Sequence, residues 1–166
     1  MVLSVSGCVD IYGARGVLGG KEPPAPIVYR ERLKAQLTRT FDTNVSDPGS
    51  WNYAASDSAV VKKGTEWLTI LVQVTILEYG IIDNISKLLC ITLPNIDRYV
   101  HVQVKGADGS LQWDKIYKNS VAPPESITLQ SPLDGPWSLH VDAVGFGAPK
   151  YGADSFNVMM TVSEPS

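Results

Sequence analysis

The side chains that most often carry acid–base or nucleophilic chemistry are sparse in this chain. Its two histidines, His101 and His140, fall at outward positions of predicted strands, and neither has a serine or cysteine nucleophile beside it. They could be neighbours on one sheet face, where solvated polar side chains are ordinary. The Gly-x-Ser-x-Gly pattern of a nucleophile elbow is also absent from the sequence. These residues predict that the protein is not an enzyme.

Metal chemistry has few candidate ligands in this sequence. The two cysteines, Cys8 and Cys90, are far apart and form none of the close Cys/His pairs that hold zinc. Calcium needs several oxygen ligands, and Asp142 and Asp154 flank one predicted loop, where they could converge across a hairpin. The alternative is that these aspartates are turn residues exposed to water. The sequence therefore predicts no required cofactor, with Ca²⁺ as the candidate ligand of Asp142 and Asp154.

Two tryptophans stand among polar neighbours in predicted strands. Trp67 shares its strand face with threonines and a glutamine, and Trp113 lies between Gln112 and Asp114. An exposed aromatic face suits stacking on sugars or contact with a protein. Alternatively, the second sheet or a loop covers both side chains. Trp67 and Trp113 are the candidate ligand-binding residues, whereas Trp137 is in phase with inward residues and is expected in the core.

Cys8 lies in a pattern that suggests an address on the cell surface. The segment Val5-Ser6-Gly7-Cys8 is similar to a prokaryotic lipobox, in which small residues admit a peptidase and the cysteine then carries acyl chains. Only seven residues precede Cys8, so a basic region and most of an apolar region are missing. The pattern is therefore either a lipidation site with a longer natural start or a chance match of common residues.

Composition places the chain among ordinary globular domains. Its 166 residues are 44% hydrophobic and 19% charged, which suits one domain with its own core. The net charge of −3 gives no general attraction to nucleic acid or to an anionic membrane. No run of 18 apolar residues occurs, so we expect no transmembrane helix and membrane contact only through a lipid anchor.

The hydrophobic period along most of the chain is two, which indicates β-strands. In the first predicted strand, Leu33, Ala35, Leu37 and Phe41 are expected on the inner face and basic residues on the outer face. The Pro123-Pro124-Glu125 segment is expected to break the pattern. Strands are predicted over 29–41, 58–61, 65–77, 88–93, 99–105, 111–117, 126–130, 137–143 and 156–162.

These segments are separated by turn signals at short, even spacing, of which Asp108-Gly109 is the clearest. Eight to ten such strands are typical of an all-β antiparallel sandwich, jelly-roll-like in form. Residues 1–26 are rich in glycine and proline and are interpreted as a leader or tether, and 27–166 as a single sandwich domain.

The segment 97–162 resembles the pre-peptidase C-terminal domains, which are small extracellular β-sandwiches that accompany secreted proteases. The resemblance rests on the alternating strand 99–104, on Asp108-Gly109, and on the segments 124–129, 132–141 and 156–158. Where that family carries an Asp-x-Asp-Leu pattern before its hairpin, this chain has Asp97-Arg98-Tyr99-Val100. The resemblance implies a secreted, non-catalytic accessory or binding module, and the calcium site of that acidic pattern does not carry over to these residues.

Three functional hypotheses follow from these observations. The first is a non-catalytic module for binding or structural support, extracellular or on the cell surface, with a protein or glycan partner and no nucleic acid. The second is a self-assembling filament or surface-layer subunit, a homo-oligomer in which residues 1–22 are donated as a strand to a neighbour. The third is a carbohydrate-binding module that uses Trp67 and Trp113.

Overall fold

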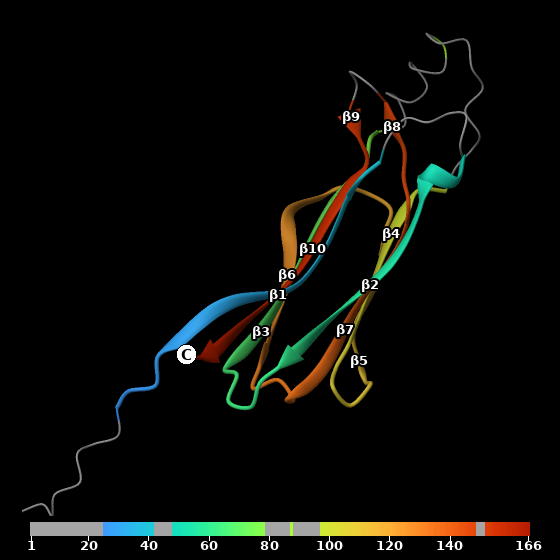
Figure 1. The fold of residues 1–166 in the computed structure, drawn as a ribbon. Helices are drawn as coiled ribbons and strands as arrows, with labels where there is room; N and C mark the ends of the chain where they lie inside the picture. Colours follow the sequence, from blue (N-terminus) through green and yellow to red (C-terminus); the bar gives the residue numbers. More distant parts are fainter. Residues whose placement is uncertain (1–24, 42–47, 79–86, 88–96, 149–151) are drawn as a thin grey trace, which may run out of the picture.

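The structure is a computed structural model that describes residues 25–41, 48–78, 87, 97–148 and 152–166. Two four-stranded antiparallel sheets face each other (Figure 1). Sheet A has the order β1-β10-β3-β6, and sheet B has the order β2-β7-β4-β5. The strands of sheet A are β1 (Tyr29–Thr40), β10 (Ser155–Pro165), β3 (Trp67–Thr75) and β6 (Val121–Gln130). Those of sheet B are β2 (Asn52–Val61), β7 (Gly135–Val144), β4 (Tyr99–Lys105) and β5 (Leu111–Tyr117).

Three short elements complete the described fold. A 3-10 turn, η2 (Pro48–Trp51), leads into β2, and β8 (Gly147–Ala148) pairs with β9 (Gly152–Ala153) beyond the end of the sandwich. With this small pair set aside, the order of strands in the two sheets is that of a jelly roll. The prediction of an all-β, jelly-roll-like sandwich of eight to ten strands is confirmed. The described residues contain no helix long and apolar enough to cross a membrane.

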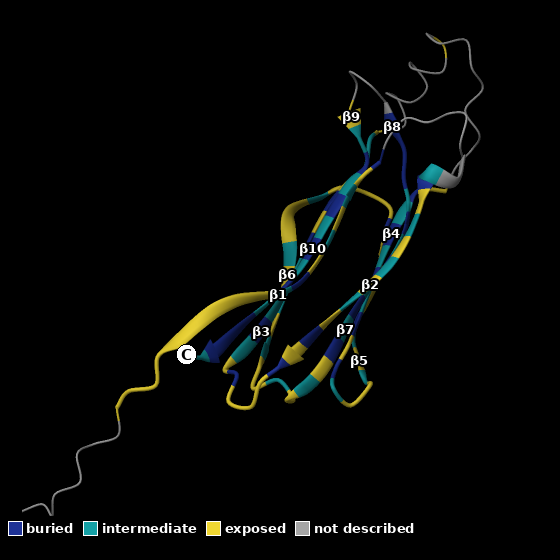
Figure 2. Cartoon of the chain, in the orientation of Figure 1, coloured by how far each residue is buried: buried dark blue, intermediate teal, exposed yellow. Residues whose placement is uncertain are grey.

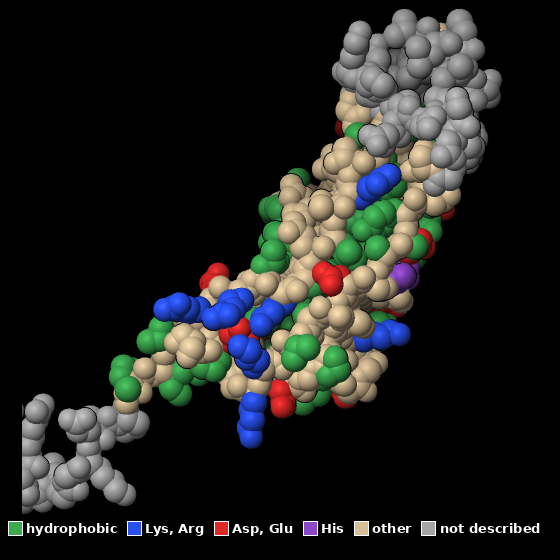
Figure 3. All heavy atoms as spheres, viewed as in Figure 1, with side chains coloured by type: hydrophobic (Ala, Val, Ile, Leu, Met, Phe, Trp, Pro, Cys, Tyr) green, Lys and Arg blue, Asp and Glu red, His purple; other side chains and the backbone are tan. Residues whose placement is uncertain are grey.

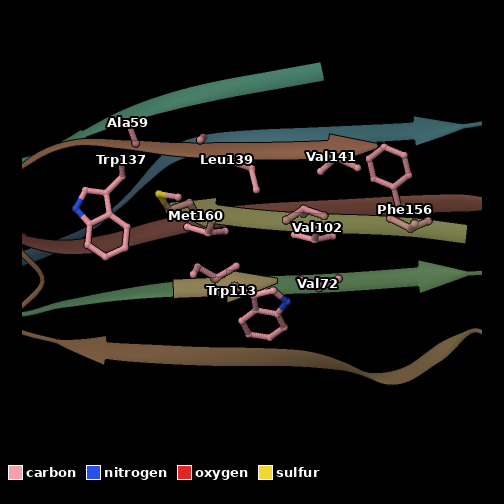
Figure 4. Packing of buried hydrophobic residues seen from close by; sticks show 14 of the residues in the cluster. Ala59, Val72, Val102, Trp113, Trp137, Leu139, Val141, Phe156 and Met160 are labelled. Carbon is pink, nitrogen blue, oxygen red and sulfur yellow. The ribbon is translucent and has the colours of Figure 1, made fainter. Parts of the chain in front are cut away.

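The core lies between the sheets and follows from the alternation of side chains along the strands. In β3, Leu68, Ile70, Val72 and Val74 are all buried, while the residues between them are half-buried or exposed. Figure 2 colours the strands by this burial. Side chains from both sheets meet in this layer (Figure 4). Trp137 is buried as expected, and its Nε1 donates a hydrogen bond to the Leu133 carbonyl at 2.8 Å.

A β-bulge in β1 changes the expected faces of that strand. Leu33 pairs with Thr161 and Ala35 with Met160, so Lys34 is an extra residue in the ladder. The alternation of inward and outward side chains is therefore reversed before the bulge relative to the part of β1 after it. The prediction that Leu33 faces inward is wrong: its side chain is 54% exposed, whereas Ala35 is buried.

Two edge strands begin earlier than the sequence indicated. β2 begins at Asn52 rather than at residue 58, because its first half is built from small and polar residues without a clear alternation. β6 begins at Val121 and contains Pro123 and Pro124, which were expected to break the strand. Proline is tolerated here because β6 is an edge strand, and one side of its backbone has no ladder partner.

The two sheets are tied together at both long edges. On one edge, Lys115 of β5 lies 2.7 Å from Glu125 of β6, with its ammonium also over the ring of Tyr117. On the other edge, the backbone N–H of Gln36 in β1 donates to Asp57 of β2 at 3.2 Å. These polar contacts bridge the edges where hydrophobic packing ends.

Candidate functional site

The outer face of sheet A is a described surface of uniform chemistry. We call it the neutral face, because among the described outward side chains of β1, β10, β3 and β6 only Glu31 is charged. Threonine, serine, glutamine and asparagine line most of it, with a few large apolar residues between them. Its rows across the strands include Leu33–Thr161–Thr69–Thr128, Gln36–Met159–Leu71–Ser126, Thr38–Asn157–Gln73 and Glu31–Ser163–Trp67–Gln130.

Hydrogen bonds between neighbouring strands hold several side chains of the neutral face in position. Thr69 and Thr128 share a hydrogen bond of 2.9 Å between their hydroxyls. The amide of Gln36 donates to the Asn157 side-chain oxygen at 2.8 Å. Trp67 begins β3 and lies half-buried between Gln130 and Ser163. The face thus offers ordered hydroxyl and amide groups with one accessible indole.

Trp113 does not share that surface. It points into the sandwich from β5 and is 9% exposed, packed in the hydrophobic core. This corrects its assignment as a ligand-binding residue and confirms the alternative that the second sheet covers it. Gln112 and Asp114, the polar neighbours that suggested an exposed position, face outward because successive strand residues alternate.

The outer face of sheet B carries charged and ionisable groups instead. His101 and His140 lie on the adjacent strands β4 and β7, as the sequence suggested, and are one diagonal step apart in the ladder. His101 Nε2 lies 2.6 Å from the Asp114 carboxylate, and Ser56 Oγ lies 2.8 Å from His140 Nδ1. The hydrogen bond from His101 holds the pKa of Asp114 below its usual value.

These groups pair with each other across exposed strands. Tyr99 donates a hydrogen bond of 2.8 Å to Asp142, and that bond raises the pKa of the tyrosine hydroxyl. Asp142 sits opposite His101 in the ladder, on the outer face of the sheet. Such cross-strand pairs stabilise a sheet.

The expected calcium ligands, Asp142 and Asp154, do not converge. Asp154 is 2% exposed, and Arg98 Nη1 lies 2.8 Å and 3.1 Å from its two carboxylate oxygens. The backbone N–H groups of Leu77 and Phe146 donate to the same carboxylate at 2.7 and 2.8 Å. A guanidinium therefore occupies the cation position at Asp154, which corrects the metal prediction. No group of three metal-ligating side chains occurs within the described ranges.

Sequence reasoning missed a charged cluster around Glu164, at the end of the sandwich where β1 begins. The Glu164 side chain is fully buried, yet Lys34 lies 3.0 Å, Arg32 3.2 Å and Lys62 3.6 Å from its carboxylate. Burial raises the pKa of this carboxyl, but the Lys34 hydrogen bond and the charges of Lys34, Lys62 and Arg32 outweigh it, so the pKa is lowered. The signal in the sequence was the basic first half of β1, which was interpreted as a solvated face.

Several predictions fall outside the described residues. Cys8, Cys90, the leader up to residue 24 and the strand expected over 88–93 lie there. The lipidation site at Cys8 remains a prediction.

Comparisons with known proteins identify no family for this chain. No family model matches the chain, and no curated protein matches it in sequence. Among solved structures, it is similar to the protein GEBA250068378 from Sulfurospirillum deleyianum, with 8% identity and a TM-score of 0.34. The similarity covers 78% of this chain and 98% of that one. The resemblance of 97–162 to pre-peptidase C-terminal domains stays a prediction.

Proposed function

We propose that this chain is a non-catalytic binding module of the cell exterior, secreted or held at the cell surface. Its buried carboxylates serve the fold: Asp154 is held by Arg98 and Glu164 by cations from β1 and the β2–β3 turn. The resemblance to pre-peptidase C-terminal domains and the lipobox-like segment at Cys8 support the extracellular location.

The neutral face carries this proposal. Charged residues are normally distributed over the whole surface of a protein. Their depletion is typical of the centre of a protein interface. Four adjacent strands present one outward charge, Glu31, and that charge lies toward one end of β1. The outer face of sheet B, built by the same fold, shows the ordinary mixture with Lys105, Asp114 and Asp142. The contrast between the two faces supports a binding role for sheet A.

A neutral glycan is the ligand class that best fits this face. A charged ligand would lose hydration without meeting an opposite charge there. Sugar hydroxyls can instead exchange hydrogen bonds with the ordered threonine, glutamine and asparagine side chains. Trp67 adds an aromatic surface on which a sugar ring can stack. Of the two tryptophans expected to bind sugar, this proposal retains Trp67 alone.

The test is binding of the full chain to neutral polysaccharides, including cellulose, chitin, glucans and mannans, by pull-down and calorimetry. We expect one of these classes to bind and Trp67→Ala to weaken it by about tenfold. Ile116→Ala is the matched control, because Ile116 is 55% exposed on the outer face of sheet B. Equal losses in the two variants, or no binding to any neutral glycan, would contradict glycan recognition by sheet A.

The non-catalytic assignment has its own test. Turnover of a substrate that is abolished by His101→Gln or Asp114→Asn would show an active site on sheet B. We expect neither variant to change any binding measured on sheet A, because the two residues lie on the opposite layer of the sandwich.

A further inference from the structure

Basic side chains gather at one end of the sandwich, which we call the β1 pole. Three of them surround the buried Glu164 carboxylate at 3.0 to 3.6 Å. Arg30 is the ladder partner of Glu164, and Lys63 follows Lys62 in the β2–β3 turn. Figure 3 shows the blue side chains grouped where β1 begins. The cations of the pole are Arg30, Arg32, Lys34, Lys62 and Lys63.

The bulge in β1 produces this gathering. Arg30 and Arg32 precede the bulge, and their ladder partners Glu164 and Val162 are inward residues of β10. Without the extra residue, the alternation of the later part of β1 would turn these arginines toward the neutral face.

Two cations of the pole stay exposed although they pair with Glu164. The carboxylates near the pole include Glu31 and Glu66, both exposed, and the buried Glu164. The terminal carboxyl of Ser166, beside Val28, and Asp134, which precedes the ladder partner of Val61, also lie at this end. The basic character of the pole therefore rests on the clustering and exposure of its cations and not on a count of charges. The side chains of Arg32 and Lys62 are 49% and 57% exposed, so their charges remain accessible to a partner.

Large apolar side chains are exposed beside these cations. Ile27 is 68% exposed, Val28 56% and Tyr29 41%, and Leu33 lies just before the bulge. Figure 3 shows green side chains next to the blue group at this end. Nucleic acids and acidic polysaccharides attract cations but gain little from exposed aliphatic groups. A surface of basic, aliphatic and aromatic residues is typical of proteins that rest on anionic lipid bilayers.

We propose that the β1 pole binds the surface of an anionic lipid membrane. Arg30, Arg32, Lys62 and Lys63 approach the lipid phosphates, while the apolar residues that lead into β1 enter the interfacial layer. The overall negative charge predicted no such attraction, because composition does not show that cations are segregated at one end. The inference is independent of the glycan proposal, since the five cations of the pole and Trp67 of the neutral face are different residues on different surfaces. It is also independent of lipidation at Cys8.

The experiment is co-sedimentation of the full chain with lipid vesicles. All proteins carry Cys8→Ser, so that an acyl chain cannot contribute to binding. Vesicles of equimolar phosphatidylglycerol and phosphatidylcholine are compared with vesicles of phosphatidylcholine alone. We expect binding to the anionic vesicles only, weakening as the salt concentration rises. Glycerol phosphate at the same phosphate concentration should not displace the protein.

The decisive variant is Arg30→Gln/Lys63→Gln, which leaves the three cations around Glu164 in place. Each basic residue near an anionic surface changes partitioning by about fivefold, so the double variant should bind roughly 25-fold more weakly. Ile27→Ser/Val28→Ser tests the apolar part and should lower partitioning by roughly tenfold. The matched control is Lys105→Gln/Lys118→Gln, which removes the same charge from residues outside the pole.

Each of the remaining outcomes overturns the proposal. Equal losses in the pole variant and the control would mean a diffuse charge effect. Binding to phosphatidylcholine alone would remove the role of charge. Displacement by glycerol phosphate would mean a small-anion site, and self-association through β1 without vesicle binding would mean a protein contact. Circular dichroism of each variant confirms that the sandwich is folded.

Discussion

The Glu164 carboxyl is fully buried, and the stability of the fold depends on its ionisation. Its folded-state pKa lies below the usual value of 4.5, so the ionised form stabilises the fold at pH values above 4.5. That stabilisation is lost as the pH falls from about 4.5 through the folded-state pKa. We expect the free energy of unfolding to decrease in this acidic window, as measured by urea unfolding at a series of pH values.

Glu164→Gln isolates this contribution. The variant should be less stable than the wild type near neutral pH, because Lys34, Arg32 and Lys62 lose their counter-charge. Its stability should also decline less steeply on acidification, although Asp114 and Asp108, whose pKa values are also lowered, still contribute. Parallel pH profiles for the variant and the wild type would mean that Glu164 is not responsible.

Asp154 is the second residue on which the fold depends. It joins Arg98, which precedes β4, to the backbone of Leu77 after β3 and Phe146 after β7. Asp154→Asn would leave a buried guanidinium without its counter-charge, so we expect a loss of about 3 kcal/mol in the free energy of unfolding. Asp134→Asn is the control, because Asp134 is an exposed turn residue and should change stability by about 0.5 kcal/mol or less.

For single residues, the sequence predicted the placement of a side chain where strand alternation determines it. It failed where a contact between distant segments determines the partner. The strand positions of His101 and His140 could be predicted, because alternation fixes the face of a regular strand. The partner of Asp154 could not, because Arg98 lies 56 residues away and nothing local marks the pair. Trp113 shows a third case, in which polar neighbours on an alternating strand say nothing about the residue between them.

Among the elements, β1 is an edge strand with which another chain could pair. Asp57 of β2 accepts the N–H of Gln36 and so occupies one donor of this edge. Charged groups at strand edges protect sheets against edge-to-edge association. We expect Asp57→Ala to increase self-association, measured by light scattering over a range of protein concentrations. Asp134→Ala removes the same charge elsewhere, and identical behaviour of the two variants would show that Asp57 does not guard β1.

The strand bounds were predicted most accurately where apolar and polar residues alternate most clearly. β4 and β5 were predicted at their observed bounds, because Val100, Val102 and Val104 alternate cleanly and Asp108-Gly109 marks the turn. β2 and β6 were predicted too short, because edge strands bury less and accept polar residues or proline. The bulge at Lys34 inserts one residue into β1 without any change in the local pattern, so it could not be foreseen.

At the scale of the whole molecule, the assembly hypothesis can be separated from the binding-module hypothesis. We expect the full chain and a chain lacking residues 1–26 both to be monomers by size-exclusion chromatography with light scattering, with or without calcium. The described sandwich supports this, because both sheets are complete and enclose a continuous core within one chain. Assembly of the full chain alone would instead indicate that the leader is donated as a strand.

The distribution of charge is a property that only the folded molecule reveals. The sequence gives a net charge of −3, and its composition predicts no anionic partner. Folding separates this charge into a neutral face on sheet A, a mixed face on sheet B and a basic end where β1 begins. Each of these surfaces is assembled from strands that are distant in sequence, so a local pattern such as the basic first half of β1 shows only part of a surface.

The backbones of Val28, just before β1, and Ser166, just after β10, meet at one end of the sandwich. The Ser166 N–H donates a hydrogen bond of 2.9 Å to the Val28 carbonyl, and β10 ends beside the start of β1 (Figure 1). A domain whose ends coincide can be inserted into a surface loop of a host protein with little distortion of either partner. Residues 28–166, taken as a unit, are therefore suited to grafting as an insertion, with the β8–β9 pair at the other end of the sandwich directed away from the host.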